Sequence, residues 1–172
     1  MHCFIYEVSE KPIREDERIS IQMLPDWFTL TVADTVSDLY GEERDDAIED
    51  FTSSLEIRHG SNDDGFTIND GVRRTWFGSK FRKFNYAVAR LSDIPFSVFC
   101  NTEDAQRRNV SGIDPYKGFI KAFDDLKLAV DDKYGNYIYD AAKCGLVTFD
   151  AWIREYAGSA KFYFGGVIDY HY

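Results

Sequence analysis

The chain has 172 residues, of which 44% are hydrophobic and 16% aromatic, so it can bury one substantial core and is rather short for two. Its formal net charge is -10, which disfavours binding of a nucleic-acid backbone by most of its surface, because phosphate contacts need cations. No apolar run approaches the roughly 20 residues that a membrane span requires. We therefore predict a single domain over residues 1–172 that does not cross a membrane.

The negative charge is concentrated in the first third of the chain. Residues 1–57 carry 15 acidic and 4 basic side chains, whereas residues 58–90 carry 3 acidic and 7 basic ones. Residues 91–172 are closer to balance, with 12 acidic and 9 basic side chains. Such a distribution favours solubility, a partner with a basic surface, or imitation of a polyanion.

The cysteines suggest a cellular compartment. Cys3, Cys100 and Cys144 are far apart, odd in number and form no CxxC pair. This pattern is typical of buried thiols in a reducing compartment. Because Cys100 follows the apolar residues 96–99, we expect its side chain to pack in the core. We predict a cytoplasmic protein.

The first part of the chain predicts short strands. Residues 2–9 are rich in β-branched and aromatic side chains and predict a strand, and the charged residues 10–18 predict an exposed loop. Residues 19–34 predict two further strands, separated by a turn at Pro25 and Asp26. Asp34 or Ser37 is expected to cap the helix that follows.

Residues 42–57 predict an amphipathic helix. Ala47, Ile48, Phe51 and Leu55 recur at the spacing of one helical face, and acidic residues occupy most of the other positions. The exposed face is the densest negative surface that the sequence offers, and we predict that it binds a partner protein. The residues of this predicted binding face are Glu42, Glu43, Asp45, Asp46, Glu49 and Asp50.

A second charged feature, residues 71–92, contains no carboxylate. Aromatic residues stand between its cations, an arrangement found on surfaces that bind anions or bases. The cations are Arg73, Arg74, Lys80, Arg82, Lys83 and Arg90. Turn-forming residues at 59–65 and a short predicted strand at 66–69 come before this stretch.

The periodicity of this basic stretch predicts a helix that begins at Ser79. Phe81, Phe84, Val88 and Leu91 are expected to form its core face. The residues left to bind a nucleic acid or another polyanion are Arg73, Arg74, Trp76, Arg82, Lys83, Tyr86 and Arg90. The alternative is that these cations pair with the acidic helix of the same chain.

The second half of the chain predicts a strand at 96–100, a polar loop at 101–112, and a helix that Asp114 caps and Pro115 begins. The expected core face of this helix consists of Tyr116, Phe119, Phe123, Leu126 and Val130. Residues 136–144 predict a short helix, Thr148 caps a last helix, and residues 161–172 predict a strand or a hairpin about Gly165 and Gly166. This order predicts the α+β class, with a small, mostly antiparallel sheet covered by about four or five helices.

Signals for catalysis and for metals are weak. The sequence contains no nucleotide-binding, zinc-protease or serine-hydrolase motif, and residues 60–71 do not have the ligands of a calcium loop. If the first and last strands were neighbours, His2 and Cys3 could approach Asp169 and His171 and hold a metal, but exposed terminal groups are the favoured interpretation. We therefore predict no metal, no cofactor and no catalytic residue. An enzyme whose site is assembled only by the fold is an alternative.

Charge therefore gives the leading functional hypothesis. Small acidic inhibitors from phages and mobile elements that imitate DNA, among them antirestriction and anti-CRISPR proteins, resemble this sequence in their charge pattern. The resemblance is one of composition and assigns no residue roles. It implies a non-enzymatic protein that binds stoichiometrically to a basic partner protein, such as one that handles nucleic acid. The alternative from another class is a nucleic-acid or polyanion-binding module that uses the basic stretch at 73–90.

Overall fold

The computed structural model describes residues 2–57, 65–101, 114–130, 133–155 and 160–172. Internal contacts divide the chain into two compact units, a sheet unit of residues 1–76 and 132–172 and a helical unit of residues 77–131. The predicted α+β class with a mostly antiparallel sheet is confirmed. One domain over residues 1–172 stays a prediction. No helix in the described ranges has both the length and the apolar character needed to cross a membrane.

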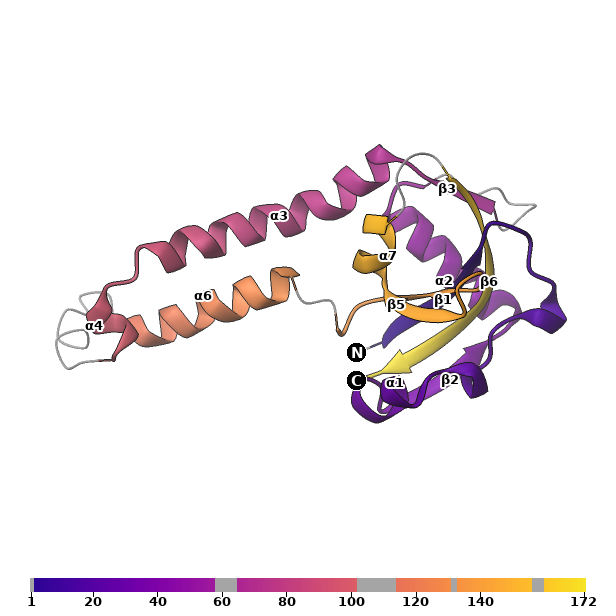
Figure 1. Cartoon of the computed structure of the whole chain (residues 1–172), viewed down its shortest axis with the longest axis horizontal. Helices are drawn as coiled ribbons and strands as arrows, with labels where there is room; N and C mark the ends of the chain where they lie inside the picture. The colour runs from indigo at the N-terminus through magenta and orange to yellow at the C-terminus, as the bar shows by residue number, and fades with distance from the viewer. Residues whose placement is uncertain (1, 58–64, 102–113, 131–132, 156–159) are drawn as a thin grey trace. The chain divides into compact units, whose positions relative to one another are not determined.

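The six-stranded sheet is organised around its last strand (Figure 1). The strands are β1 (His2–Ser9), β2 (Thr35–Leu39), β3 (Gly65–Ile68), β4 (Tyr137–Asp140), β5 (Gly145–Thr148) and β6 (Ala160–His171). Strand β6 pairs antiparallel with β1 on one side, and with β2 and β3 on the other. Strand β1 also pairs with β4 in parallel, and β4 pairs with β5. The first and last strands of the chain are therefore neighbours.

Helices and hydrophobic side chains fill both faces of the sheet. The helical segments of the sheet unit are two short 3-10 helices (Glu15–Glu17 and Ile21–Met23), α1 (Asp26–Thr31), α2 (Gly41–Ser54) and α7 (Phe149–Glu155). One core cluster joins Phe28 of α1 to Ile5, Ile168 and Tyr170 of the sheet. Elsewhere, Phe51 of α2 lies against Phe149 of α7, with ring centroids 5.0 Å apart. These buried aromatic side chains hold the helices on the sheet.

Strand β6 is continuous through Gly165 and Gly166, so the hairpin alternative for residues 161–172 is wrong. Tyr6 pairs with Val167 and Val8 with Phe164, which leaves the two glycines opposite the single residue Glu7. This is a β-bulge, in which an extra residue bends one strand and makes room for a close contact. The Glu7 carboxylate fills that room and accepts hydrogen bonds from the N–H groups of Ile19 (2.8 Å) and Gly166 (2.7 Å).

The helical unit contains residues 77–92 of α3 (Asp70–Ser92), together with α4 (Phe96–Phe99) and α6 (Pro115–Val130). Within this unit, α3 and α6 lie side by side in Figure 1, and the Arg90 guanidinium donates to the Gly118 carbonyl over 3.1 Å. The predicted start of α6 is confirmed, because the Asp114 carboxylate accepts a hydrogen bond from the Tyr116 N–H over 3.0 Å. Ala87, Ala122 and Ala129 are its buried apolar residues in the described part of the chain.

Several short elements differ from the prediction. Residues 19–34 form a 3-10 helix and α1 rather than two strands, residues 96–99 form α4 rather than a strand, and residues 137–140 form β4 rather than a helix. None of these segments has a clear apolar period, so tertiary contacts decide their conformation. The expected caps of the acidic helix are also wrong. Asp34 precedes β2 and Ser37 lies within it, whereas Tyr40 occupies the N-cap position of α2.

The predicted core faces of α3 and α6 are partly wrong. Helix α3 begins at Asp70 rather than Ser79, and its inward face passes through Phe84, Ala87 and Leu91. Phe81, expected in the core, is 62% exposed, and Val88 is also exposed. In α6 the buried positions are Ala122 and Ala129, whereas Phe123 and Val130 are exposed. Within the helical unit, alanines occupy the buried positions of both helices, and several large apolar residues lie beside them on the surface. The turn-forming residues 59–64 and the polar loop at 102–112 lie outside the described residues.

Candidate functional site

The predicted acidic face exists on α2. All six of its carboxylate side chains are exposed, namely those of Glu42, Glu43, Asp45, Asp46, Glu49 and Asp50. At about 100° per residue they lie within an arc of roughly 160°. Ala47, Ile48 and Phe51 occupy the opposite side of the helix and are buried. The helix therefore presents the carboxylates of this acidic face to solvent.

Tyr6 of β1 holds the buried side of α2. Its ring stacks on Phe51, with centroids 4.3 Å apart, and its hydroxyl donates to the Ala47 carbonyl over 3.1 Å. Burial raises the pKa of the Tyr6 hydroxyl above its ordinary value, and the charge of Asp50 adds to this effect. The hydroxyl thus stays protonated and remains a donor. These contacts fix the orientation of the acidic face on the sheet.

Arg44 is a buried residue of this helix whose structural role the sequence interpretation missed. It is buried, and its Nε donates to the Gly165 carbonyl over 2.8 Å while Nη1 contacts the Asp45 carboxylate at 2.7 Å. A basic residue on the apolar side of an acidic helix was the available signal, since position 44 lies on the same face as Ala47, Ile48 and Phe51. Arg44 anchors α2 to the bulge of β6 and partly neutralises Asp45.

The charge density of the acidic face is similar to that of a nucleic acid. Residues 42–50 of α2 span about 12 Å along the axis, at roughly 1.5 Å per residue. Six carboxylates over this length, one of them paired with Arg44, give about one carboxylate per 2 Å, compared with about one charge per 1.7 Å along a DNA duplex. Neighbouring carboxylates one helical turn apart are separated by about 5–6 Å at their Cβ atoms.

The predicted anion-binding face around 73–90 is only partly available. The Trp76 indole N–H donates to Asp150 over 2.5 Å, and its ring contacts Phe149 edge-on. Trp76 therefore belongs to the packing of the sheet unit and is not the contact residue that we expected. Arg73 lies 4.0 Å from the carboxylate of Asp70 in the same helix.

Within the helical unit, Arg90 is also engaged. It contacts Asp125 of α6 at 3.7 Å and lies over the ring of Tyr86 at 5.7 Å from the centroid. Arg82, Lys83 and Tyr86 are exposed on α3. Lys83 and Tyr86 line a shallow depression together with Asp125 and Leu128. Of the predicted anion-binding residues, Arg74, Arg82, Lys83 and Tyr86 are therefore the ones that remain exposed.

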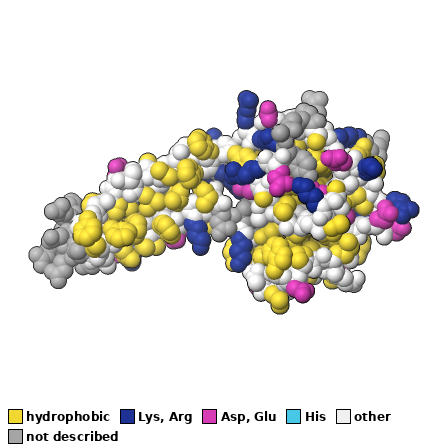
Figure 2. Space-filling view, viewed as in Figure 1, with side chains coloured by type: hydrophobic (Ala, Val, Ile, Leu, Met, Phe, Trp, Pro, Cys, Tyr) yellow, Lys and Arg dark blue, Asp and Glu magenta, His cyan; other side chains and the backbone are white. Residues whose placement is uncertain are grey.

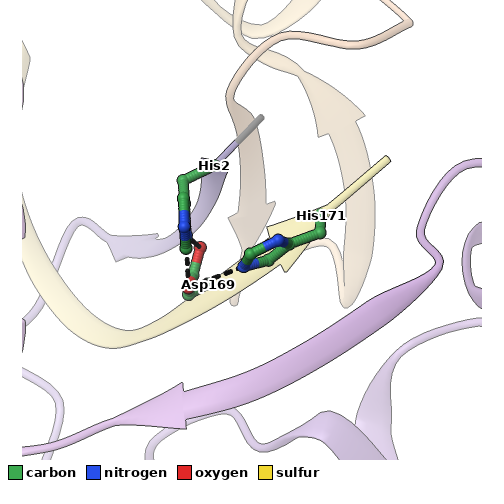
Figure 3. Close-up of side chains that lie close together, drawn as sticks. All are labelled: His2, Asp169 and His171. Carbon is green, nitrogen blue, oxygen red and sulfur yellow. Dashed lines mark hydrogen bonds and ion pairs between the residues drawn. The ribbon is translucent and has the colours of Figure 1, made fainter.

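A third group of polar side chains lies where the chain ends meet. His2 of β1 and Asp169 and His171 of β6 are close together, as the pairing of the first and last strands allows (Figure 3). Cys3 does not join them, since successive strand residues point to opposite faces; its thiol donates to the Tyr134 carbonyl. The expectation of buried thiols is wrong, because Cys100 and Cys144 are exposed.

Comparison with known proteins assigns no role to these residues. Neither a protein-family model, nor a curated protein sequence, nor a solved structure matches the chain.

Proposed function

We propose that the protein acts by stoichiometric binding, through the acidic face of α2, to a partner protein with a basic surface. The observation that carries this proposal is the exposure of six carboxylates on one side of a single helix whose opposite side is buried. Such a surface attracts a basic partner over the distance at which charges act in salt solution, about 10 Å at 0.1 M. The partner class that fits best is a nucleic-acid-handling protein, because its own basic groove is built to receive a row of anions.

The mechanism is electrostatic competition. The carboxylates of α2 stand in for phosphates, occupy the cations of the partner and prevent it from binding its nucleic acid. Tyr6 and Arg44 hold α2 in place, so the charges are presented by a rigid element and little conformational entropy is lost on binding. We therefore expect affinity to fall steeply as salt rises, mainly through slower association.

A charge-matched pair of variants tests the proposal. One variant carries Glu42→Gln, Asp46→Asn and Glu49→Gln on α2, and the control carries Glu10→Gln, Glu15→Gln and Asp16→Asn on another exposed segment. Each variant removes three of the ten net negative charges. The wild type is immobilised, proteins retained from a host lysate are identified, and each binder is purified. The affinity of each purified binder for the wild type, the α2 variant and the control variant is then measured at two salt concentrations.

We expect the α2 variant to lose about tenfold or more in affinity and the control variant to lose little. The wild type should also displace DNA or RNA from the purified binder at a one-to-one ratio. Equal binding by both variants would mean that only net charge matters, and binding that does not respond to salt would contradict the mechanism.

The exposed cations of α3 support a second candidate function. Arg82, Lys83 and Tyr86 lie within about one helical turn of each other, and such a group can contact phosphates and stack on a base. A gel shift with single- and double-stranded nucleic acid tests it. A shift abolished by Arg82→Glu with Lys83→Glu, and unaffected by the α2 variant, would favour this function over the first.

We also propose a cytoplasmic location. The three cysteines, all within described ranges, form no disulfide, and two of them are exposed. Exposed thiols persist more readily in a reducing compartment. Labelling these thiols in intact cells and after lysis, without reductant, would check the proposal.

A further inference from the structure

The chain ends bring two imidazoles and a carboxylate to one face of the sheet. In the antiparallel register of β1 and β6, His2 stands opposite His171 and Phe4 stands opposite Asp169. Because opposite residues share a face and side-chain direction repeats every two residues, all three polar side chains point the same way. Figure 3 shows contacts from the Asp169 carboxylate to both histidine rings. The cluster lies entirely within the sheet unit.

The distances within this cluster suit a metal ion. His2 Nδ1 lies 3.0 Å and His171 Nε2 lies 3.6 Å from Oδ2 of Asp169. Tetrahedral zinc, with bonds of about 2.0–2.1 Å, places its ligand atoms about 3.3 Å apart. One donor atom from each of the three residues lies within 4.8 Å of the others. Small rotations of the two partly exposed histidines would therefore complete the geometry.

The charges in the cluster also suit a metal ion. The histidine ring centroids are only 3.8 Å apart, and both rings lie against the same carboxylate. The Asp169 carboxylate is mostly buried and supplies negative charge beside one nitrogen of each ring. A cation that accepts nitrogen and oxygen donors satisfies all three groups.

We propose that His2, Asp169 and His171 bind a divalent transition-metal ion, with zinc as the best fit and water in the remaining coordination positions. Imidazole with a single carboxylate suits zinc and its neighbours in the first transition row, whereas magnesium and calcium prefer oxygen ligands throughout. Cys3, the other candidate from the sequence, lies on the opposite face of β1 and takes no part. The bound ion ties the first strand to the last, across 167 positions of sequence.

Titration of the protein with zinc tests the proposal. The chain is purified without a histidine tag, and Zn²⁺ binding is measured by calorimetry for the wild type, Asp169→Asn, His171→Gln and His59→Gln. His59 is the third histidine of the sequence and serves as the control. Circular dichroism of each metal-free protein establishes that it is folded, and His171→Gln keeps the test valid if Asp169→Asn does not fold.

We expect one Zn²⁺ per chain, at least tenfold weaker binding for Asp169→Asn and His171→Gln, and unchanged binding for His59→Gln. Zinc should raise the melting temperature of the wild type and of the control only, because an ion that binds the folded state stabilises it. Equal binding by all four proteins, or no binding by the wild type at millimolar zinc, would overturn the proposal.

Discussion

The sheet unit and the helical unit use aromatic residues in opposite ways. In the sheet unit, Tyr6, Phe66, Phe162 and Phe164 are almost fully buried on one side of β6 and its neighbours. In the helical unit, large side chains such as those of Phe81, Phe96 and Phe123 are exposed, and alanines take the buried positions. Figure 2 shows hydrophobic side chains spread over the surface of the helical unit. An apolar stripe in the sequence therefore predicts a helix, but it does not predict which residues of the helix are covered by the rest of the fold.

Removing a ring from each unit tests this contrast most strongly. Phe164 stacks on Phe66, with centroids 4.2 Å apart, and Phe164→Ala should cost about 3–5 kcal/mol of unfolding free energy. Phe123 is 53% exposed, and Phe123→Ala should cost less than about 1 kcal/mol. Denaturant unfolding followed by tryptophan fluorescence reports on the sheet unit, which contains all three tryptophans. Helical circular dichroism reports on both units. A loss of similar size in the two variants would show that Phe123 is covered in solution, which would break the comparison.

Replacing a glycine with alanine should change the unfolding free energy in opposite directions in the two units. A Cβ added at Gly165 would stand only 2.6 Å from Cδ of Glu7, so Gly165→Ala must displace a buried carboxylate with two hydrogen bonds. We expect a loss of about 3 kcal/mol. At Gly118 in α6, a Cβ would meet only the end of Arg90, at 4.0 Å. Gly118→Ala should therefore stabilise the helix by about 0.5–1 kcal/mol. Thermal unfolding of both variants checks the two signs, and a tolerated Gly165→Ala would show that the bulge is not tightly packed.

The helices that sequence reasoning identified correctly are those with a period or a cap. The acidic helix α2 has a regular apolar stripe, α6 has Asp114 and Pro115 at its start, and α7 has Thr148 before it. For α2 the stripe also located the acidic face, because the acids fall on the opposite side. Short segments such as α1 and β4, of four to six residues, have no such signal, and strand pairing or core contacts decide their conformation.

Other features depend on contacts that are distant in sequence. Arg44 reaches the Gly165 carbonyl, and the bulge there exists because Glu7 of the first strand inserts beside the last. The grouping of His2 with Asp169 depends on the register of β1 and β6, in which a shift by one residue would reverse every side chain. In α3 and α6, the sequence pattern selected the largest apolar residues, whereas the fold placed Ala87 and Ala122 inward. Side-chain size did not indicate which face of these helices is covered.

The smallest expected difference between the units concerns their carboxylates and depends on pH. Burial raises the pKa of Glu7 above its ordinary value, and the N–H donors of Gly166 and Ile19, together with Arg18 and Arg44, offset only part of this effect. Folding therefore favours the protonated form. The resulting stability is fully present below the unfolded-state pKa, about 4.3, and is lost as pH rises through the higher folded-state pKa.

Glu7→Gln removes this titration while keeping an oxygen that can accept both N–H groups. The unfolding free energy of the wild type, measured relative to this variant by urea denaturation, should therefore increase as the pH is lowered from about 7 towards 4. Asp125→Asn is the matched change in the helical unit. It removes a partly exposed contact with Arg90 and should cost less than about 1 kcal/mol, with a smaller cost at high salt. If the wild type instead lost stability relative to Glu7→Gln on acidification, the charged form of Glu7 would be the one that folding favours. The hydrogen bonds at the bulge would then outweigh burial.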